Sequence, residues 1–247
     1  MNDTGDTSIA SDIREASHPT PRGAILYDAS LAGHVDDAWF EPGRWPGAVD
    51  RQQGGRGAVA FLRDDDRRWV LRHYRRGGAV ARLFDDRYLY TGADGTRSFR
   101  EWRLLRELMV LGLPAPRPVA ARYARDGLFY RADLLTVELP SRLTLAQAIV
   151  AAALPAQRWA EIGRCIGAFH THGVRHADLN AHNIVLGPGR EVYLLDFDRG
   201  RIMARGSWEG AVLARLERSL VKLTAGRPAG RFGAEQWQLL LDGCRGV

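Results

Sequence analysis

The feature that most constrains the fold of this chain is a polar loop followed at once by a short β-hairpin. Residues 176–183 read His-Ala-Asp-Leu-Asn-Ala-His-Asn, and the apolar segments 184–186 and 192–195 after them are joined by a turn that begins with Gly-Pro-Gly at 187–189. Glycine and proline are the residues that tight turns require, so the two segments are predicted to pair as antiparallel strands. The tripeptide Asp-Phe-Asp follows at 196–198. The hairpin should therefore bring this tripeptide back toward the polar loop.

Composition excludes several classes of protein. The chain has 247 residues, of which 45% are hydrophobic, which is enough for a buried core and argues against disorder. No apolar run approaches the roughly 20 residues that span a bilayer. The N-terminus is polar and lacks the basic start and apolar core that a secretory signal has. The two cysteines, Cys165 and Cys244, belong to no metal-binding cluster. Neither a disulfide scaffold nor a zinc site is expected, and a reducing cytoplasm fits best.

The positive charge of the chain is almost wholly arginine. The net charge is +6, and Lys222 is the only lysine. Eight arginines lie between residues 63 and 87, at positions 63, 67, 68, 72, 75, 76, 82 and 87. This concentration favours a phosphate-bearing partner or an anionic membrane surface, and a solvated strand face is the alternative interpretation.

The spacing of apolar residues predicts the elements around the loop. These are strands at 58–62, 69–74 and 128–139, and helices at 98–111, 143–153 and 155–172. Ser98 and Glu101 have the spacing of a capping box at the start of the first helix. Gly54, Gly55 and Gly57 precede the first strand. They form either a turn whose amides approach a phosphate closely or an ordinary surface turn.

The loop, the hairpin and the acidic tripeptide resemble, in this order, the catalytic core of the protein-kinase-like superfamily. The resemblance implies an α+β, bilobal fold, with an antiparallel sheet and one helix in the N-lobe and a small, mostly helical C-lobe. It divides the chain into a flexible N-terminal tail at residues 1–23, a nucleotide-binding N-lobe at 24–135, a hinge at 136–140 and a C-lobe at 141–247 that carries the catalytic loop and the metal site.

The same resemblance implies roles for the loop residues. Asp178 is expected to orient the acceptor hydroxyl and to accept its proton. Asn183 and Asp196 are expected to hold Mg²⁺, whose preference for oxygen ligands suits an amide carbonyl and a carboxylate. We expect His176 to hold the loop by a hydrogen bond and not to perform acid–base chemistry. Asp198 stands where protein kinases have glycine, so it either helps to hold a second metal or ties down the turn.

Residues upstream match the ATP-binding part of the superfamily. The glycine-rich turn would cover the phosphates, and Arg72 stands where a phosphate-binding lysine is usual, although a guanidinium fork is not interchangeable with an ammonium. Glu101 is the expected ion-pair partner of Arg72, with Glu107 as the alternative. The backbone around Glu138 and Leu139 would meet the adenine edge.

A longer set of segments resembles one family, the Kdo (3-deoxy-D-manno-octulosonic acid) kinases of Gram-negative lipopolysaccharide synthesis. The shared stretches lie at 53–57, 69–78, 86–90, 98–118 and 176–200. The family implies ATP-dependent phosphorylation of the Kdo 4-hydroxyl on a Kdo-lipid A precursor. The reaction would take place at the cytoplasmic face of the inner membrane, to which the protein would bind peripherally.

Two sets of side chains would then face the acceptor or the anionic membrane. The first consists of four arginines, Arg75, Arg76, Arg82 and Arg87, whose charge suits phosphates and a sugar carboxylate. The second consists of tryptophans that we expect to be exposed, such as Trp39 or Trp45.

Departures from protein kinases narrow the acceptor. No Ala-Pro-Glu motif follows the Asp-Phe-Asp tripeptide, and only 51 residues follow Asp196, too few for the usual peptide-docking lobe. A small-molecule or glycan acceptor is therefore favoured over a protein. The alternatives are a small atypical protein kinase, a kinase of another sugar, and a catalytically dead pseudokinase or nucleic-acid-binding module. A pseudokinase is disfavoured because Asp178, Asn183 and Asp196 are intact, and a nucleic-acid-binding module is disfavoured because the chain has no recognisable nucleic-acid-binding motif. No nucleic acid or protein partner is inferred.

Overall fold

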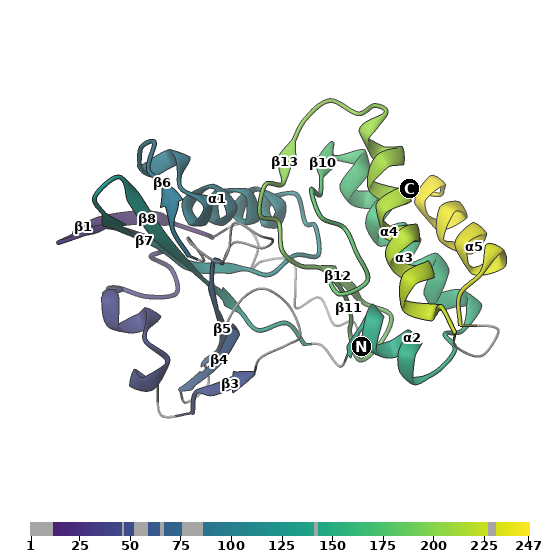
Figure 1. Cartoon of the computed structure of the whole chain (residues 1–247), viewed down its shortest axis with the longest axis horizontal. Coiled ribbons are helices and arrows are strands. Elements are labelled where there is room, and N and C mark those ends of the chain that lie inside the picture. Colours follow the sequence, from purple (N-terminus) through teal and green to yellow (C-terminus); the bar gives the residue numbers. More distant parts are fainter. Residues whose placement is uncertain are drawn as a thin grey trace, which may run out of the picture. The chain divides into compact units, whose positions relative to one another are not determined.

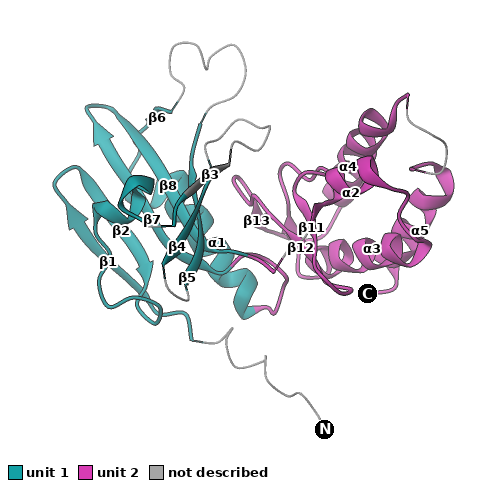
Figure 2. Ribbon diagram, turned by 90° about the horizontal axis from the view of Figure 1, so that it is seen from below, with its two compact units in different colours: residues 1–110, 117–138 teal, residues 111–116, 139–247 magenta. Residues whose placement is uncertain are grey.

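The computed structural model describes residues 12–45, 47–51, 59–64, 67–75, 86–140, 143–226 and 231–247. The chain divides into two units: unit 1 comprises residues 1–110 and 117–138, and unit 2 comprises residues 111–116 and 139–247 (Figure 2). The division after Glu138 falls within the segment expected to be the hinge, whereas residues 111–116, expected in the N-lobe, belong to unit 2. Antiparallel strands and helices together confirm the α+β class; the bilobal arrangement stays a prediction.

Unit 1 is built around an eight-stranded antiparallel sheet (Figure 1). Its strands are β1 (Glu15–Thr20), β2 (Gly23–Asp28), β3 (Val49–Arg51), β4 (Val59–Asp64), β5 (Arg67–His73), β6 (Tyr88–Leu89), β7 (Pro118–Asp126) and β8 (Phe129–Val137). They are ordered β1-β2-β7-β8-β5-β4-β3, with β6 paired to β8. The strands predicted at 58–62 and 69–74 are confirmed as β4 and β5, which pair with Phe61 opposite Val70, and the strand predicted at 128–139 is confirmed as β8.

The prediction of a flexible tail over residues 1–23 is wrong from Glu15 onward. Strand β1 pairs with β2 along its whole length, from Glu15 opposite Asp28 to Thr20 opposite Gly23. Its sequence, Glu-Ala-Ser-His-Pro-Thr, alternates exposed with half-buried residues, as an edge strand with one covered face does. Pro19 is tolerated there because an edge strand has one side without a partner strand. This polar composition concealed the strand.

Alternation along β5 gives the sheet two different faces. Trp69 and Leu71 point into an apolar cluster that also includes Ala32, Val35 and Phe40 from segment 29–45. Arg72, the next residue, points to the opposite face, where it meets helix α1 (Arg97–Val110). A charged side chain can therefore stand in a central strand without entering the apolar cluster.

Trp39 and Trp45 are not exposed, which corrects the expectation that they anchor the protein to a membrane. Both are half-buried and pack against the apolar cluster. The ring of Trp39 stacks on that of Trp69, with centroids 5.1 Å apart, and the Trp45 indole Nε1 donates a hydrogen bond to the Trp39 carbonyl at 3.1 Å. Their large apolar surfaces are thus used inside unit 1.

Helix α1 begins at Arg97, so Ser98 lies within it and the capping-box prediction is wrong. The Ser98 hydroxyl donates to the main-chain carbonyl of Arg122 on β7 at 2.9 Å. Glu101, the other half of the expected box, turns to Arg72. Both side chains are buried. Their hydrogen-bond and ion-pair partners lie on strands of the sheet and not at the start of the helix.

Unit 2 contains four helices and two small sheets in its described part. The helices are α2 (Leu145–Ala151), α3 (Ala156–Thr171), α4 (Trp208–Thr224) and α5 (Ala234–Arg245). The strands are β9 (Leu143–Thr144), β10 (Val174–Arg175), β11 (Ile184–Leu186), β12 (Val192–Leu194) and β13 (Arg201–Ile202), ordered β12-β11-β9 and β10-β13. The predicted hairpin is confirmed as β11 and β12, with Ile184 opposite Leu194. Within the described ranges, no helix has the length and apolar character needed to cross a membrane.

Helices α3 and α5 pack so closely that only glycine fits between them. A Cβ atom on Gly163 would lie 2.0 Å from the carbonyl oxygen of Leu240, and one on Gly243 would lie 2.4 Å from the carbonyl oxygen of Ala160. Helix α3 leads into β10 and the polar loop. This backbone contact therefore supports the segment that carries Asp178.

We expect Gly163→Ala to lower the free energy of unfolding by about 1–3 kcal/mol, because the added methyl group meets rigid backbone and forces the helices apart. Gly210→Ala is the matched control, since Gly210 lies in α4 with open space around it, and it should stabilise the protein by up to about 1 kcal/mol through helix propensity. Urea denaturation of both variants measures the difference. Equal stability of the two variants would contradict the close packing of α3 and α5.

Candidate active site

His176 ties the polar loop to the end of the hairpin. Its Nδ1 accepts a hydrogen bond from the backbone N–H of Asp178 at 3.2 Å, and its Nε2 lies 2.8 Å from the carbonyl oxygen of Leu195. An N–H group only donates and a carbonyl only accepts, so both bonds form when the ring is neutral and carries its proton on Nε2. The residue is 3% exposed, and its ring lies 4.9 Å from that of Phe197. This buried position gives His176 a structural task.

Burial also sets the charge of the ring. It lowers the pKa of His176 below the ordinary value of 6.5, because a charged imidazolium would lose its hydration, and this effect exceeds the opposing effects of the Leu195 carbonyl and the nearby carboxylates. Protonation would convert Nδ1 into a donor and remove the acceptor for the Asp178 N–H. The site is therefore built on a neutral histidine.

Asn183 and Asp196 are placed at the same end of two neighbouring strands. The Leu195 N–H donates to the Asn183 carbonyl at 2.8 Å, which extends the β11–β12 ladder to the residue before Asp196. The Asn183 side-chain amide donates through Nδ2 to the main-chain carbonyl of Asp178 at 2.9 Å. Its Oδ1 is then the atom suited to a metal. An amide oxygen together with the Asp196 carboxylate fits Mg²⁺, which prefers oxygen ligands.

Asp196 adopts a backbone conformation that disfavours most residues. Its φ is 62°, in the left-handed region that favours glycine. Such strain, on the order of 1–3 kcal/mol, persists only where the surroundings hold it. Here Phe197, which follows, is 1% exposed and stacks on Phe169 with ring centroids 5.5 Å apart. The buried ring anchors the chain so that Asp196 leaves the hairpin at this fixed angle.

The carboxylate of Asp178 has an ion-pair partner that sequence reasoning missed. Arg215, on α4, donates from its Nε to Asp178 Oδ1 at 2.6 Å. The Asp178 side chain nevertheless stays 48% exposed. The ion pair orients one face of the carboxylate and leaves the other accessible. No local pattern could have indicated Arg215, because it lies 37 residues further along the chain.

Helices α2 and α4 hold the backbone of the loop at Ala181. Its N–H donates to the Ser219 hydroxyl of α4 at 3.3 Å, and its carbonyl accepts from the Ala146 N–H of α2 at 2.9 Å. Asn180 adds a second amide to the Asp178 carbonyl, at 2.9 Å. The loop is therefore held mainly through its main chain, which leaves the Asp178 carboxylate available.

In unit 1, Arg72 and Glu101 form the ion pair that was expected. Arg72 Nη2 contacts Glu101 Oε2, and the Tyr74 hydroxyl donates to the same oxygen at 2.6 Å. The Arg72 guanidinium lies over the Tyr74 ring, 4.6 Å from its centroid. Glu107 is exposed and is not this partner. Tyr74 was missed, although it stands two residues after Arg72, where the alternation of an extended chain returns to the same face.

The other residues expected to bind ATP are only partly described. The Glu138 N–H donates to the Arg68 carbonyl at 2.9 Å, and its side chain lies 3.9 Å from Arg63. Leu139 begins the longer segment of unit 2. Three glycines expected over the phosphates lie outside the described residues: Gly54, Gly55 and Gly57.

The arginines expected to face the acceptor or the membrane have mixed outcomes. Arg75 is exposed, whereas Arg87 forms an ion pair with Asp126 at 3.1 Å. Arg76 and Arg82 lie outside the part of the chain that the structure describes. In unit 2, Asp198 is half-buried beside the hairpin.

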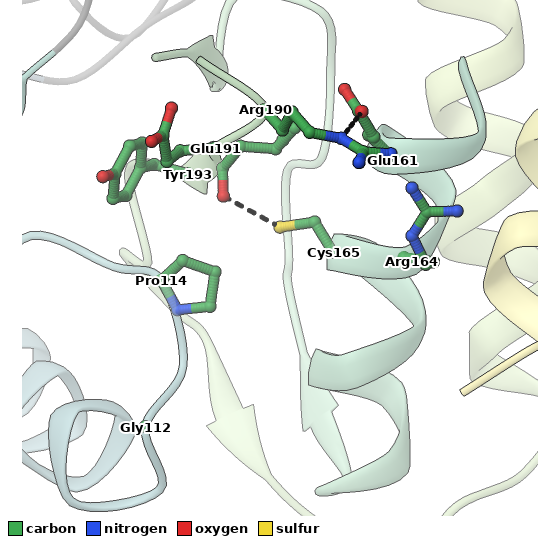
Figure 3. Close-up of a pocket in the computed structure, with 9 residues that line it drawn as sticks. Gly112, Pro114, Glu161, Arg164, Cys165, Arg190, Glu191 and Tyr193 are labelled. Atoms are coloured by element: carbon green, nitrogen blue, oxygen red, sulfur yellow. Dashed lines mark hydrogen bonds and ion pairs between the residues drawn. The ribbon is translucent and has the colours of Figure 1, made fainter. Parts of the chain in front are cut away.

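A separate pocket of about 720 Å³ in unit 2 contains none of the expected site residues (Figure 3). Cys165 lines it, and its thiol donates to the Val192 carbonyl at 3.3 Å. Burial raises the pKa of Cys165, so the thiol stays protonated. Arg190 in the same pocket is paired with Glu161 at 2.7 Å. A cysteine nucleophile is therefore not indicated there.

A family model described as the Lipopolysaccharide kinase (Kdo/WaaP) family matches residues 37–243. The chain belongs to this family. The match covers Arg72, Glu101 and the whole polar loop with its hairpin, and begins after β2. This lipopolysaccharide-kinase family member is a phosphotransferase that uses an alcohol group as acceptor.

Curated relatives agree with the family match. A protein named 3-deoxy-D-manno-octulosonic acid kinase from Xanthomonas campestris pv. campestris (strain B100) is 46% identical over 207 residues, 83% of each chain. One of the same name from Xylella fastidiosa (strain M12) is 44% identical over 207 residues, again 83% of each chain. Another from Stenotrophomonas maltophilia (strain K279a) is 42% identical over 226 residues, 89% of this chain and 90% of the relative.

We expect the free energy of unfolding of His176→Gln to fall less steeply with decreasing pH than that of the wild type. Because the folded state holds His176 with a lowered pKa, the unfolded chain binds a proton first as the pH falls below about 6.5. The free energy of unfolding of the wild type should then fall by up to about 1.4 kcal/mol per pH unit from this group, until the folded-state pKa is reached. The variant should lack this component while being less stable at pH 7.5.

Urea denaturation at pH 7.5, 6.5 and 5.5 measures the effect. His170, whose pKa burial also lowers, and His73, whose pKa is raised by the hydrogen bond that it donates to Asp133, contribute equally to both proteins and cancel in the difference. His182→Gln on the exposed part of the same loop is the control and should keep the wild-type slope. An unchanged slope in His176→Gln would show that His176 is not held neutral.

Proposed function

We propose that this kinase transfers the γ-phosphoryl group of ATP to the 4-hydroxyl of Kdo in a Kdo-lipid A precursor. One observation carries the proposal: Asp178, Asn183 and Asp196 are held in one arrangement by His176 and the hairpin. Relatives that share 42% and 46% identity with this chain are named for the same sugar acid. Their similarity extends over most of the chain, which supports a shared acceptor.

Mg²⁺ bound with ATP would neutralise the charge on the transferred phosphoryl group. Asn183 would hold the metal through Oδ1 and Asp196 through its carboxylate. The Gly200 N–H closes the turn on the Phe197 carbonyl at 2.7 Å. Asp198 stays a candidate for a second metal as well as for support of this turn.

Asp178 would act on the acceptor. Its carboxylate is oriented by Arg215 and exposed on its other face, so a sugar hydroxyl can donate a hydrogen bond to it. As the new P–O bond forms, the hydroxyl proton passes to this carboxylate. Arg215 positions Asp178 and is not itself required to accept a proton.

Arg72 would bind the phosphates of ATP. A guanidinium carries five N–H donors, and the ion pair with Glu101 and the stacking on Tyr74 hold its plane in one orientation. The N–H of Glu138 is used within unit 1. The contact with the adenine edge would then fall to the Glu138 carbonyl and the Leu139 N–H.

Binding at the membrane would be peripheral, at the cytoplasmic face of the inner membrane. The half-buried Trp39 and Trp45 do not support it, so it would rest on charge. Arg75 is an exposed candidate for contact with anionic headgroups or acceptor phosphates. No nucleic acid is needed for this function.

The proposed reaction is tested by transfer of labelled phosphate from ATP to a Kdo-lipid A precursor. Asp178→Asn should lower kcat by about 100-fold or more, because the acceptor hydroxyl loses its proton acceptor while the shape of the loop is kept. Glu191→Gln, on the exposed turn of the hairpin, is the control and should transfer at the wild-type rate. Folded wild-type protein that binds ATP and transfers nothing to this acceptor would disprove the Kdo assignment and favour another sugar or a protein.

Arg72→Ala should lower kcat/KM for ATP by about 100- to 1000-fold, as removal of one preorganised donor to a transition-state charge does. Arg72→Lys should restore part of the loss, because an ammonium still binds phosphate as a point charge. Steady-state kinetics against ATP measure both, and Arg68→Ala on the exposed start of β5 is the control. Wild-type kinetics in Arg72→Ala would move the phosphate contact to another residue.

A further inference from the structure

Two arginines stand directly opposite each other in the small β10–β13 sheet (Figure 1). Arg175 pairs with Arg201, and the Met203 N–H donates to the Gly173 carbonyl at 2.9 Å, which extends the ladder at its other end. Opposite residues of an antiparallel pair share a face, with Cβ atoms about 4.5–5.5 Å apart. Two positively charged side chains therefore leave the sheet side by side.

Neither guanidinium has a hydrogen-bond or ion-pair partner among the residues that the structure describes. Arg175 is half-buried and Arg201 is exposed. Five of the nine other arginines described in unit 2 pair with a carboxylate: Arg158, Arg190, Arg205, Arg215 and Arg245. Like charges placed opposite each other destabilise a sheet. An anion between the two side chains would remove this cost.

The pair belongs to the same segment as the reacting residues. Arg175 precedes His176 directly, and β13 follows the Asp-Phe-Asp tripeptide. Three residues of extended chain span at most about 11 Å, so the Cα of Arg175 lies within that distance of the Cα of Asp178. Because His176 fixes the intervening backbone, an anion bound by Arg175 would hold a fixed distance from the Asp178 carboxylate.

We propose that Arg175 and Arg201 form a site for an oxyanion of the acceptor, either a phosphate monoester or a carboxylate. The inference rests on the proposed function, since a Kdo-lipid A precursor carries both groups. Guanidinium forks bind such oxyanions with two parallel hydrogen bonds each. Met203, two residues after Arg201 and therefore on the same face, is 39% exposed, and apolar surface next to the charges suits a lipid-linked acceptor. The site would hold the acceptor so that its hydroxyl meets Asp178.

The double variant Arg175→Gln with Arg201→Gln tests the site. Its KM for the acceptor should rise about 10- to 100-fold, because one or two charge-assisted hydrogen bonds are lost. Its KM for ATP should stay at the wild-type value. Its Tm without added anions should equal or exceed that of the wild type, because like-charge repulsion has been removed. A purely structural pair would instead give a lower Tm. Arg164→Gln with Arg218→Gln removes two exposed charges that have no carboxylate partner among the described residues, and is the control.

Modified acceptors identify the oxyanion. If the site binds phosphate, a dephosphorylated acceptor should raise the KM of the wild type to that of the double variant and leave the double variant unchanged. If it binds the sugar carboxylate, the methyl ester of that group should have this effect. Either result supports the proposal, and a double variant with the wild-type KM for the unmodified acceptor overturns it.

A binding measurement separates this inference from the proposed function. If the wild type transfers nothing to a Kdo acceptor, the proposed function fails, and inorganic phosphate decides whether the oxyanion site exists. Phosphate should then raise the Tm of the wild type and of the control variant more than that of the double variant. Equal shifts in all three proteins overturn the site.

Discussion

The two hydrogen bonds of the buried His176 ring are the interaction on which the arrangement of the polar loop depends. One bond holds the Asp178 N–H and the other holds the Leu195 carbonyl, so a loop and a strand end that are 19 residues apart move as one body. The ring is neutral because its burial opposes charge. A neutral link costs little desolvation.

Other contacts also hold the polar loop through its main chain. Amide groups of Asn180 and Asn183 converge on the Asp178 carbonyl, and a close contact between α3 and α5 through glycines holds the helix before the loop. In unit 1, the planar guanidinium of Arg72 is held by Glu101. A fixed plane suits an arginine, whose donors form a rigid fork.

Several local rules of stability are broken next to the polar loop and the hairpin that follows it. Asp196 has a positive φ, and Arg175 faces Arg201 across β10 and β13. Elsewhere in the described part of unit 2, arginines are commonly matched with carboxylates. Concentration of unfavourable features at one site is typical of a region whose sequence serves binding and catalysis as well as folding.

The amino-acid sequence by itself determined the hairpin, most of the helices, and the identity of the loop residues, because each depends on spacing within a few residues. It also indicated the Arg72–Glu101 pair through the order of its motifs. Only the tertiary structure decided that Glu15 begins a strand, that Ser98 turns to the sheet, and that Trp39 packs inward. The same holds for the contact of Arg215 with Asp178. These features depend on which distant segments meet, and burial and hydrogen-bond partners are known only once the chain has folded.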